Sequence, residues 1–259
     1  MPSRPRADAE CCPTPPGVGG ARERIRRSTE EVAVAGRVQL VVLDVNETLS
    51  DMEPLRERFT SAGAPASLLD TWFASTLRDG FALAAAGAAA PFPKVGAGVL
   101  RALLTPLPDL AVPVDEAVDN VLAGFPELDL HPDVADGLRL LADAGVRLVT
   151  LTNGSATLSA RLFDRAGLND LLERRMSVDD AGRWKPHRRA YESALDQCGV
   201  AADRAAMVAV HPWDTDGAKR AGLLSAYVDR RGMPYPDVFL APDVTGPDLP
   251  SVARALLEL

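Results

Sequence analysis

The stretch Val38–Val45, VQLVVLDV, is an apolar run rich in β-branched residues that carries an aspartate near its end. Such a run is typical of a strand that is buried on both faces of a parallel sheet. After residue 131 the pattern alternates between predicted helices (134–144, 156–166, 186–198, 215–221) and predicted strands (147–151, 174–178, 206–210, 225–228). This alternation predicts an α/β fold, in which helices cover both faces of a Rossmann-like parallel sheet.

A segment with helical periodicity and no convincing strand separates the first strand from the alternating region. Its helical patterns cover Leu55–Phe59, Ser67–Leu83, Gly98–Leu104 and Val114–Ala123. We therefore predict a core formed by residues 38–53 and 131–259, with a helical cap, 54–130, inserted into it. Residues 1–37 combine Pro, Gly and Arg with little hydrophobic periodicity, which predicts a disordered N-terminal leader. A start codon assigned too far upstream explains this segment equally well.

Composition and charge limit the classes of partner. The 259 residues are 47% hydrophobic and 25% charged, as in an average globular chain, and carry a net charge of −8. This charge repels phosphate backbones and anionic lipid surfaces, so we expect neither nucleic acid nor a membrane as partner. Three cysteines without metal-ligand spacing, and a start that lacks the apolar region of a secretory signal, predict a cytoplasmic protein.

Polar side chains follow several predicted strands, at the edge where an open parallel sheet binds its ligands. They are Asp44, Asn46 and Thr48, then Thr152 and Asn153, then Lys185 in the loop before a helix, and finally His211 and Asp214. Each of them alone is equally typical of a helix cap or a loop. Together they supply a nucleophilic carboxylate, a second carboxylate, a cation and neutral donors, which predicts a catalytic site.

These residues fall in four ordered motifs, VVLDVNETLSD, LVTLTNGS, RWKP and VAVHPWDTDGA. Through them the chain resembles the haloacid dehalogenase superfamily, and within it the type II 2-haloacid dehalogenase branch, over roughly Val38 to Leu259. The resemblance implies that Asp44 is the nucleophile and Thr48 its fixed hydroxyl neighbour. It also implies a role in the site for Tyr191, six residues after Lys185, and a small (S)-2-halocarboxylic acid as substrate.

Two positions favour carbon–halogen over phosphate ester chemistry. Phosphatases of the superfamily carry an acid two residues after the nucleophile to protonate the leaving alkoxide, and this chain has Asn46 there. Position 210, where a further acid would help to bind Mg²⁺, is a valine. We therefore predict a hydrolase that needs no metal or other cofactor and forms an aspartyl ester on Asp44. A phosphatase for a small phosphate ester, or a non-catalytic binding protein of the same fold, is the alternative.

The chain also departs from the branch in the cap. The branch places an arginine directly after a cap tryptophan, and matching that tryptophan to Trp72 puts Phe73 in the place of the arginine. Arg78, the only basic residue in the 67–83 helix, is the local candidate to bind the anionic substrate; a solvated surface arginine is its alternative reading. Phe73, Tyr191 and Trp213 are predicted to wall a small apolar pocket.

His211 stands where the branch commonly has an amide. We predict that it accepts a proton from the water that hydrolyses the ester, because an imidazole titrates near neutral pH. The alternative is a structural role in capping the helix that follows. The sequence leaves a homodimer open.

Overall fold

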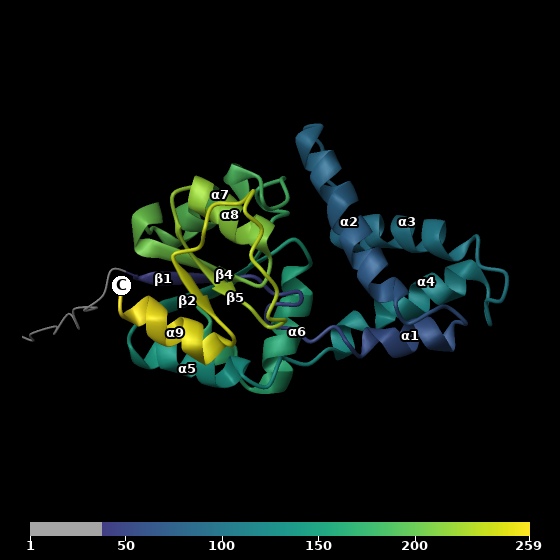
Figure 1. The fold of residues 1–259 in the computed structure, drawn as a ribbon, viewed down its shortest axis with the longest axis horizontal. Helices are drawn as coiled ribbons and strands as arrows, with labels where there is room; N and C mark the ends of the chain where they lie inside the picture. The colour runs from purple at the N-terminus through teal and green to yellow at the C-terminus, as the bar shows by residue number, and fades with distance from the viewer. Residues whose placement is uncertain (1–37) are drawn as a thin grey trace, which may run out of the picture. The chain divides into compact units, whose positions relative to one another are not determined.

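The computed structural model describes residues 38–259, so the predicted leader and its two cysteines lie outside the described residues. A six-stranded sheet forms the centre of the described part (Figure 1). Its strands are β1 (Leu40–Leu43), β2 (Arg147–Thr152), β3 (Arg174–Ser177), β4 (Ala205–Ala209), β5 (Leu224–Val228) and β6 (Val244–Gly246). They lie in the order β3-β2-β1-β4-β5-β6, and all pairs are parallel. The predicted α/β fold is confirmed.

Helices cover both faces of the sheet, which explains why β1 is apolar throughout. Val41 and Leu43 point to the face covered by α5 (Val134–Asp143), α6 (Ala156–Ala166) and α9 (Leu249–Leu257). Leu40 and Val42 point to the opposite face, which is covered by α7 (Arg188–Cys198) and α8 (Pro212–Arg220). The alternation along one strand therefore places the hydrophobic core on both sides of the sheet.

Four helices and one short 3₁₀ helix lie between β1 and α5 in the chain. They are α1 (Leu55–Ser61), α2 (Leu68–Ala85), α3 (Phe92–Leu104), α4 (Val114–Ala123) and η1 (Phe125–Glu127). They pack on one another around Trp72, a buried residue whose indole Nε1 donates a hydrogen bond to the Gly96 carbonyl at 2.9 Å. The division into a core and a cap of residues 54–130 that we propose follows this grouping.

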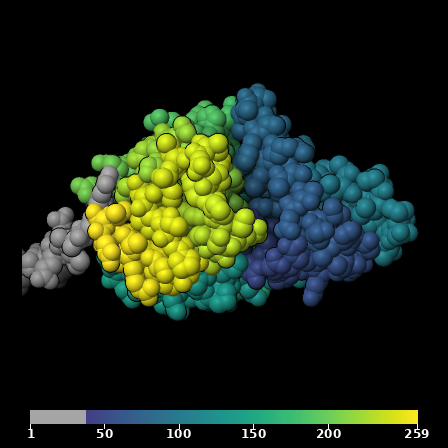
Figure 2. Space-filling view, in the orientation of Figure 1, coloured from purple at the N-terminus to yellow at the C-terminus, as the bar shows by residue number. Residues whose placement is uncertain are grey.

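Trp184 joins the inserted helices to the sheet region. Its indole Nε1 donates to the Ala90 carbonyl at 3.0 Å, and its ring stacks on Phe92 at a centroid distance of 5.9 Å. Gly80, in the middle of α2, lies so close that a Cβ atom there would stand 2.2 Å from the Trp184 ring. A glycine costs a helix interior about 1 kcal/mol relative to alanine, and here the close contact requires it. Figure 2 shows side chains of the two regions abutting along one face.

The elements differ most from the prediction in two places, while α8 begins three residues earlier than predicted and the other boundaries shift by one or two residues. Helix α3 begins at Phe92 rather than at residue 98, because Pro93 lies in the first turn, where the missing N–H needs no partner. Strand β6 and helix α9 were not predicted, although Asp248 caps α9 by accepting a hydrogen bond from the Ser251 N–H at 2.8 Å. None of the helices within residues 38–259 is long and apolar enough to cross a membrane.

Candidate active site

Asp44 lies directly after β1, with β2 and β4 as the neighbouring strands, so the loops that follow all three strands meet around it. The Thr48 hydroxyl donates to Asp44 Oδ2 at 2.6 Å and accepts a hydrogen bond from the Val210 N–H at 3.1 Å. The backbone at the end of β4 therefore fixes the threonine hydroxyl, which in turn orients the carboxylate.

Lys185 is fully buried and bridges two carboxylates. Its Nζ lies 2.9 Å from Asp44 Oδ1 and 2.6 Å from Asp214 Oδ2. The Asn153 side chain holds the backbone of the lysine, because its Oδ1 accepts from the Lys185 N–H at 2.8 Å and its Nδ2 donates to the Lys185 carbonyl at 3.1 Å. Asn153 thus fixes the backbone of a lysine that lies 32 residues further along the chain.

Tyr191 lies behind Asp214 rather than in the wall of a substrate pocket. Its hydroxyl donates to Asp214 Oδ1 at 2.6 Å, and its side chain is only 1% exposed. Gly217 packs against this hydroxyl and helps to enclose it, since a Cβ atom at position 217 would stand 2.7 Å from the tyrosine oxygen. The prediction that Tyr191 walls the pocket is therefore wrong, and we assign it the positioning of Asp214.

The charged groups of this cluster shift one another's pKa values. Burial opposes the charge of Asp44, but Lys185, His211 and the Thr48 hydroxyl outweigh burial and lower the pKa of Asp44. For Asp214, burial dominates over the attraction of Lys185, and the neighbouring Asp44 adds to burial, so the pKa of Asp214 is raised. Burial opposes the charge of Lys185 as well, yet its two carboxylate partners raise its pKa. One ammonium thus keeps Asp44 ionised, as a nucleophile requires.

His211 lies beside the nucleophile with its Nε2 atom facing acceptors. Nε2 is 3.2 Å from the Asn46 carbonyl oxygen and 3.7 Å from Asp44 Oδ2. A carbonyl oxygen accepts but cannot donate, so Nε2 carries the hydrogen in this arrangement. The prediction that His211 serves as a base is therefore not supported at Nε2, where the geometry supports an N–H donor.

Aromatic side chains from the cap and the core hold the His211 ring. The ring stacks on Trp213 at a centroid distance of 5.0 Å, and Phe73 lies 6.1 Å from it on α2. Phe81, also on α2, contacts Trp213 at 4.9 Å. Phe73 and Trp213 therefore both contact the His211 ring, and their role as the wall of an apolar substrate pocket stays a prediction.

Arg78 does not reach the site, contrary to its predicted role in substrate binding. Its side chain is 69% exposed, and its guanidinium Nε donates to Asp79 at 2.8 Å. Five residues turn an α-helix by about 140°, so position 78 points away from the face on which Phe73 contacts His211. Arg78 is a surface arginine.

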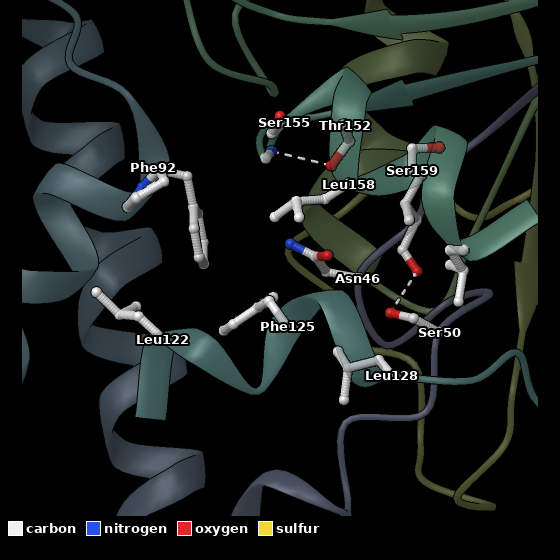
Figure 3. A pocket seen from close by; sticks show the side chains of 14 residues that line it. Asn46, Ser50, Phe92, Leu122, Phe125, Leu128, Thr152, Ser155, Leu158 and Ser159 are labelled. Carbon is white, nitrogen blue, oxygen red and sulfur yellow. Dashed lines mark hydrogen bonds between the residues drawn. The ribbon is translucent and has the colours of Figure 1, made fainter. Parts of the chain in front are cut away.

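Thr152, at the end of β2, contributes to the rim of an apolar cavity (Figure 3). Its hydroxyl accepts a hydrogen bond from the Gly154 N–H at 2.9 Å, which shapes the turn before α6. Asn46 comes from the nucleophile loop and points into the same cavity. Both predicted residues therefore lie between Asp44 and an apolar space.

Glu47 is a site residue that the sequence reasoning missed. It has a φ of 62°, a left-handed conformation that costs a non-glycine residue about 1–2 kcal/mol. Its carboxylate lies 3.7 Å from His211 Nε2 and 3.2 Å from the guanidinium of Arg231. A second cavity, of about 470 Å³, is lined by these three residues among others. The sequence did carry a signal for Glu47, because it is an acidic residue in the turn beside the nucleophile, but the prediction did not use it.

Arg230 was missed as well. Its Nη2 donates to the Thr48 carbonyl at 2.9 Å, and its Nη1 donates to Asp133 at 2.8 Å. It therefore ties the backbone of the nucleophile loop to the start of α5. Arg230 follows β5 by two residues, so the rule that collected the other strand-end side chains applied to it too.

The donor set around Asp44 does not fit a magnesium site. Mg²⁺ requires several oxygen ligands in a nearly octahedral arrangement. Within residues 38–259, no group of three or more His, Cys, Asp or Glu side chains is arranged to hold a metal ion. The Lys185 ammonium already stands between the two carboxylates that would have to bind such a cation.

A comparison with known proteins shows the family to which the chain belongs. A family model described as haloacid dehalogenase-like hydrolase matches residues 38–222, more than half of the chain. The chain therefore belongs to the haloacid dehalogenase-like hydrolases.

The curated relatives include dehalogenases and also a phosphoserine phosphatase of Thermus thermophilus, which is 34% identical over 137 residues, 51% of this chain and 55% of that protein. Haloacetate dehalogenase H-2 of Moraxella sp. (strain B) is 31% identical over 125 residues, which are 48% of this chain and 56% of that protein. (S)-2-haloacid dehalogenase 4A of Burkholderia cepacia is 31% identical over 124 residues, 48% of this chain and 53% of that protein. The chain thus spans about half the length of the curated relatives it matches.

A solved structure shows the same fold over a longer range. The L-2-haloacid dehalogenase from Xanthobacter autotrophicus superposes with a TM-score of 0.73 at 24% identity, covering 84% of this chain and 97% of that chain. This likeness shows the fold and includes the inserted helices.

Proposed function

We propose that the chain is a 2-haloacid dehalogenase that converts a small, anionic (S)-2-halocarboxylic acid into a 2-hydroxy acid. The observation that carries the proposal is the buried Asp44–Lys185–Asp214 cluster, which holds an ionised nucleophile beside an ammonium. Asn46, two residues after the nucleophile, has no acidic proton to give to an alkoxide, whereas a halide leaves without one. The named activities of the relatives support the same chemistry.

The reaction takes place in two steps. A carboxylate oxygen of Asp44 attacks C2 of the substrate from the side opposite the halogen, and the halide leaves with the electron pair of the carbon–halogen bond. Water then attacks the side-chain carbonyl carbon of the aspartyl ester, and the bond from that carbon to the product oxygen breaks. The product oxygen takes up one proton of the attacking water, and the Asp44 carboxylate is restored. The second proton of that water is released to the solvent. Lys185 holds the ionised Asp44 carboxylate before the first step and compensates the negative charge that develops on the ester carbonyl oxygen when water attacks in the second step.

Chelation tests this proposal against the phosphatase alternative. Dehalogenation of 2-chloropropanoate is expected to continue unchanged in EDTA, because the Lys185 ammonium performs the neutralisation that Mg²⁺ performs in a phosphatase. Halide release is measured with and without EDTA, and phosphate release from an aryl phosphate is measured in parallel with added Mg²⁺. Loss of halide release on chelation, restored by Mg²⁺, would contradict the proposal.

Two substitutions of His211 separate an N–H donor from a base. We expect His211→Asn to keep kcat within about twofold, because an amide can still donate to the Asn46 carbonyl. His211→Leu is expected to lose about 2- to 13-fold, since an ordinary hydrogen bond contributes about 0.5–1.5 kcal/mol. Stopped-flow halide release and the pH profile of kcat are measured for both variants. Equal losses, with a burst of halide in His211→Asn, would instead support the base.

A further inference from the structure

A small cavity of about 60 Å³ lies between the inserted helices and α6 (Figure 3). Phe92, Leu122 and Phe125 line it from the cap side, and Leu158 and Leu162 line it from α6. The labelled side chains of Phe92, Phe125 and Leu158 point toward the same space in the figure. This cavity is therefore an apolar chamber to which both parts of the structure contribute.

The chamber lies beside the loop that carries Asp44. Val45 and Asn46, the two residues after the nucleophile, line it, and the Asn46 side chain extends into it. Thr152 lines it from β2, the strand that pairs directly with β1. A group bonded to the carbon that Asp44 attacks is therefore close to this chamber.

The side chains that line the chamber favour the binding of an uncharged group. No acidic or basic side chain of the described residues lines this chamber. Its walls are mostly aromatic and aliphatic, with the neutral polar side chains of Asn46, Thr152 and three serines among them. A carboxylate or phosphate inside it would lose its hydration without a compensating charge. An alkyl group, in contrast, gains free energy when it leaves water.

The volume sets the size of that alkyl group. A cavity of about 150 Å³ holds one benzene ring, or about 25 Å³ for each carbon atom. At about 60 Å³ the chamber has room for about two carbon atoms and none for an aromatic ring.

We infer that this chamber is the subsite for the substituent on the reacting carbon and that it takes an ethyl group. The preferred substrates are then 2-halobutanoates rather than haloacetates or aromatic halo acids. The inference rests on the proposed dehalogenase function, because the position of the reacting carbon follows from attack by Asp44.

A series of 2-chloro acids tests the size of the chamber. We expect kcat/KM to rise by about fourfold for each added carbon from chloroacetate to 2-chlorobutanoate, the effect of burying one methylene group. It should fall again at 2-chloropentanoate, and 2-chloro-2-phenylacetate should be lower than 2-chlorobutanoate by about tenfold or more, since overfilling strains the walls. A flat profile across the series would overturn the inference.

Substitutions at Leu158 move the preferred length in opposite directions. Leu158→Ala removes three carbon atoms from the wall and should shift the optimum to chloropentanoate or longer acids. Leu158→Phe fills the chamber and should shift it to 2-chloropropanoate. Leu140, half-buried on α5 and absent from the cavity lining, provides the matched controls Leu140→Ala and Leu140→Phe, which should leave the optimum at butanoate. An unchanged optimum in both Leu158 variants would overturn the subsite.

Binding of the product separates failure of the subsite from failure of the proposed function. If no 2-chloro acid releases halide, the dehalogenase function is wrong. Calorimetric titration with 2-hydroxybutanoate and 2-hydroxypropanoate then still decides whether the chamber binds an ethyl group. About fourfold tighter binding of the longer acid, lost in Leu158→Phe, would support the chamber. Equal affinities, or no binding of either acid, would overturn it.

Discussion

Replacement of Asp44 by asparagine is expected to lower kcat for a 2-chloro acid by on the order of 10⁴-fold or more, the size of effect seen when a covalent nucleophile is removed. The amide has the shape of the carboxylate, but it carries no charge to attack C2 and leaves the Lys185 ammonium with one carboxylate partner instead of two. KM should change far less than kcat, because the walls of the pocket are untouched.

The covalent route is measured with isotopes. Under single turnover in ¹⁸O-labelled water, mass spectrometry of the peptide that contains Asp44 should show the label in the enzyme, because water attacks the carbonyl carbon of the ester. Asp136→Asn, on the exposed face of α5, is the matched control and should behave as the native protein. Label found only in the 2-hydroxy acid under these conditions would mean that water attacks the substrate directly, and Asp44 would not be the nucleophile.

The sequence was informative about the catalytic cluster because of the topology of parallel sheets. The carboxyl ends of β1, β2 and β4 meet at one edge whatever the loops between them do, so Asp44, Thr152 and Asp214 had to approach one another. Hydrophobic patterns sufficed to identify these strands. Lys185 lies in a loop and not at the end of a strand, and the resemblance to known motifs gave separate support for its place in the same site.

The sequence could not decide between the two readings of Arg78, substrate binding and a surface arginine, for a physical reason that lies in the cap helix. A helical pattern fixes the angle between residues, but the face that is buried depends on what the helix packs against. The buried face of α2 includes Thr76 and Gly80 alongside Trp72 and Phe73, so its orientation could not be determined from hydrophobic residues alone. Gly80 is buried because the Trp184 ring lies against it, and that contact is between residues more than a hundred positions apart.

The partners of long-range polar contacts could not be predicted from the sequence either. Arg230 donates to the carbonyl of Thr48 across 182 residues, and no local pattern predicts which backbone oxygen a surface-like arginine will choose. For Tyr191 the spacing from Lys185 placed it near the site, but only the packing around Gly217 shows that its hydroxyl serves Asp214 rather than a substrate.

Substitution of Lys185 by methionine is expected to reduce the free energy of unfolding at neutral pH by about 3–5 kcal/mol. Methionine fills nearly the same volume, but it leaves two buried carboxylates facing each other without a cation, and breaking a buried ion cluster in this way costs about that amount. Lys219→Met is the matched control. Lys219 pairs with Asp243 at a partly exposed site, so its loss should cost at most about 1 kcal/mol.

The pH dependence of this loss gives a second and independent test. In the native protein the pKa of Lys185 is raised, so its contribution to stability is fully present below its unfolded value, near 10.5, and is lost only at higher pH. The lowered pKa of Asp44 gives a contribution that is present above its unfolded value, near 3.8, and is lost in acid. Without the ammonium, burial and mutual repulsion would raise the pKa of both carboxylates above that value. Folding of Lys185→Met would then take up protons at both carboxylates, whereas in the native protein only Asp214 of this pair has a raised pKa. The variant should therefore gain more stability from pH 8 to pH 5 than the native protein. Urea unfolding at both pH values measures this difference, and a loss of stability that is independent of pH would show that Lys185 acts through packing rather than through its charge.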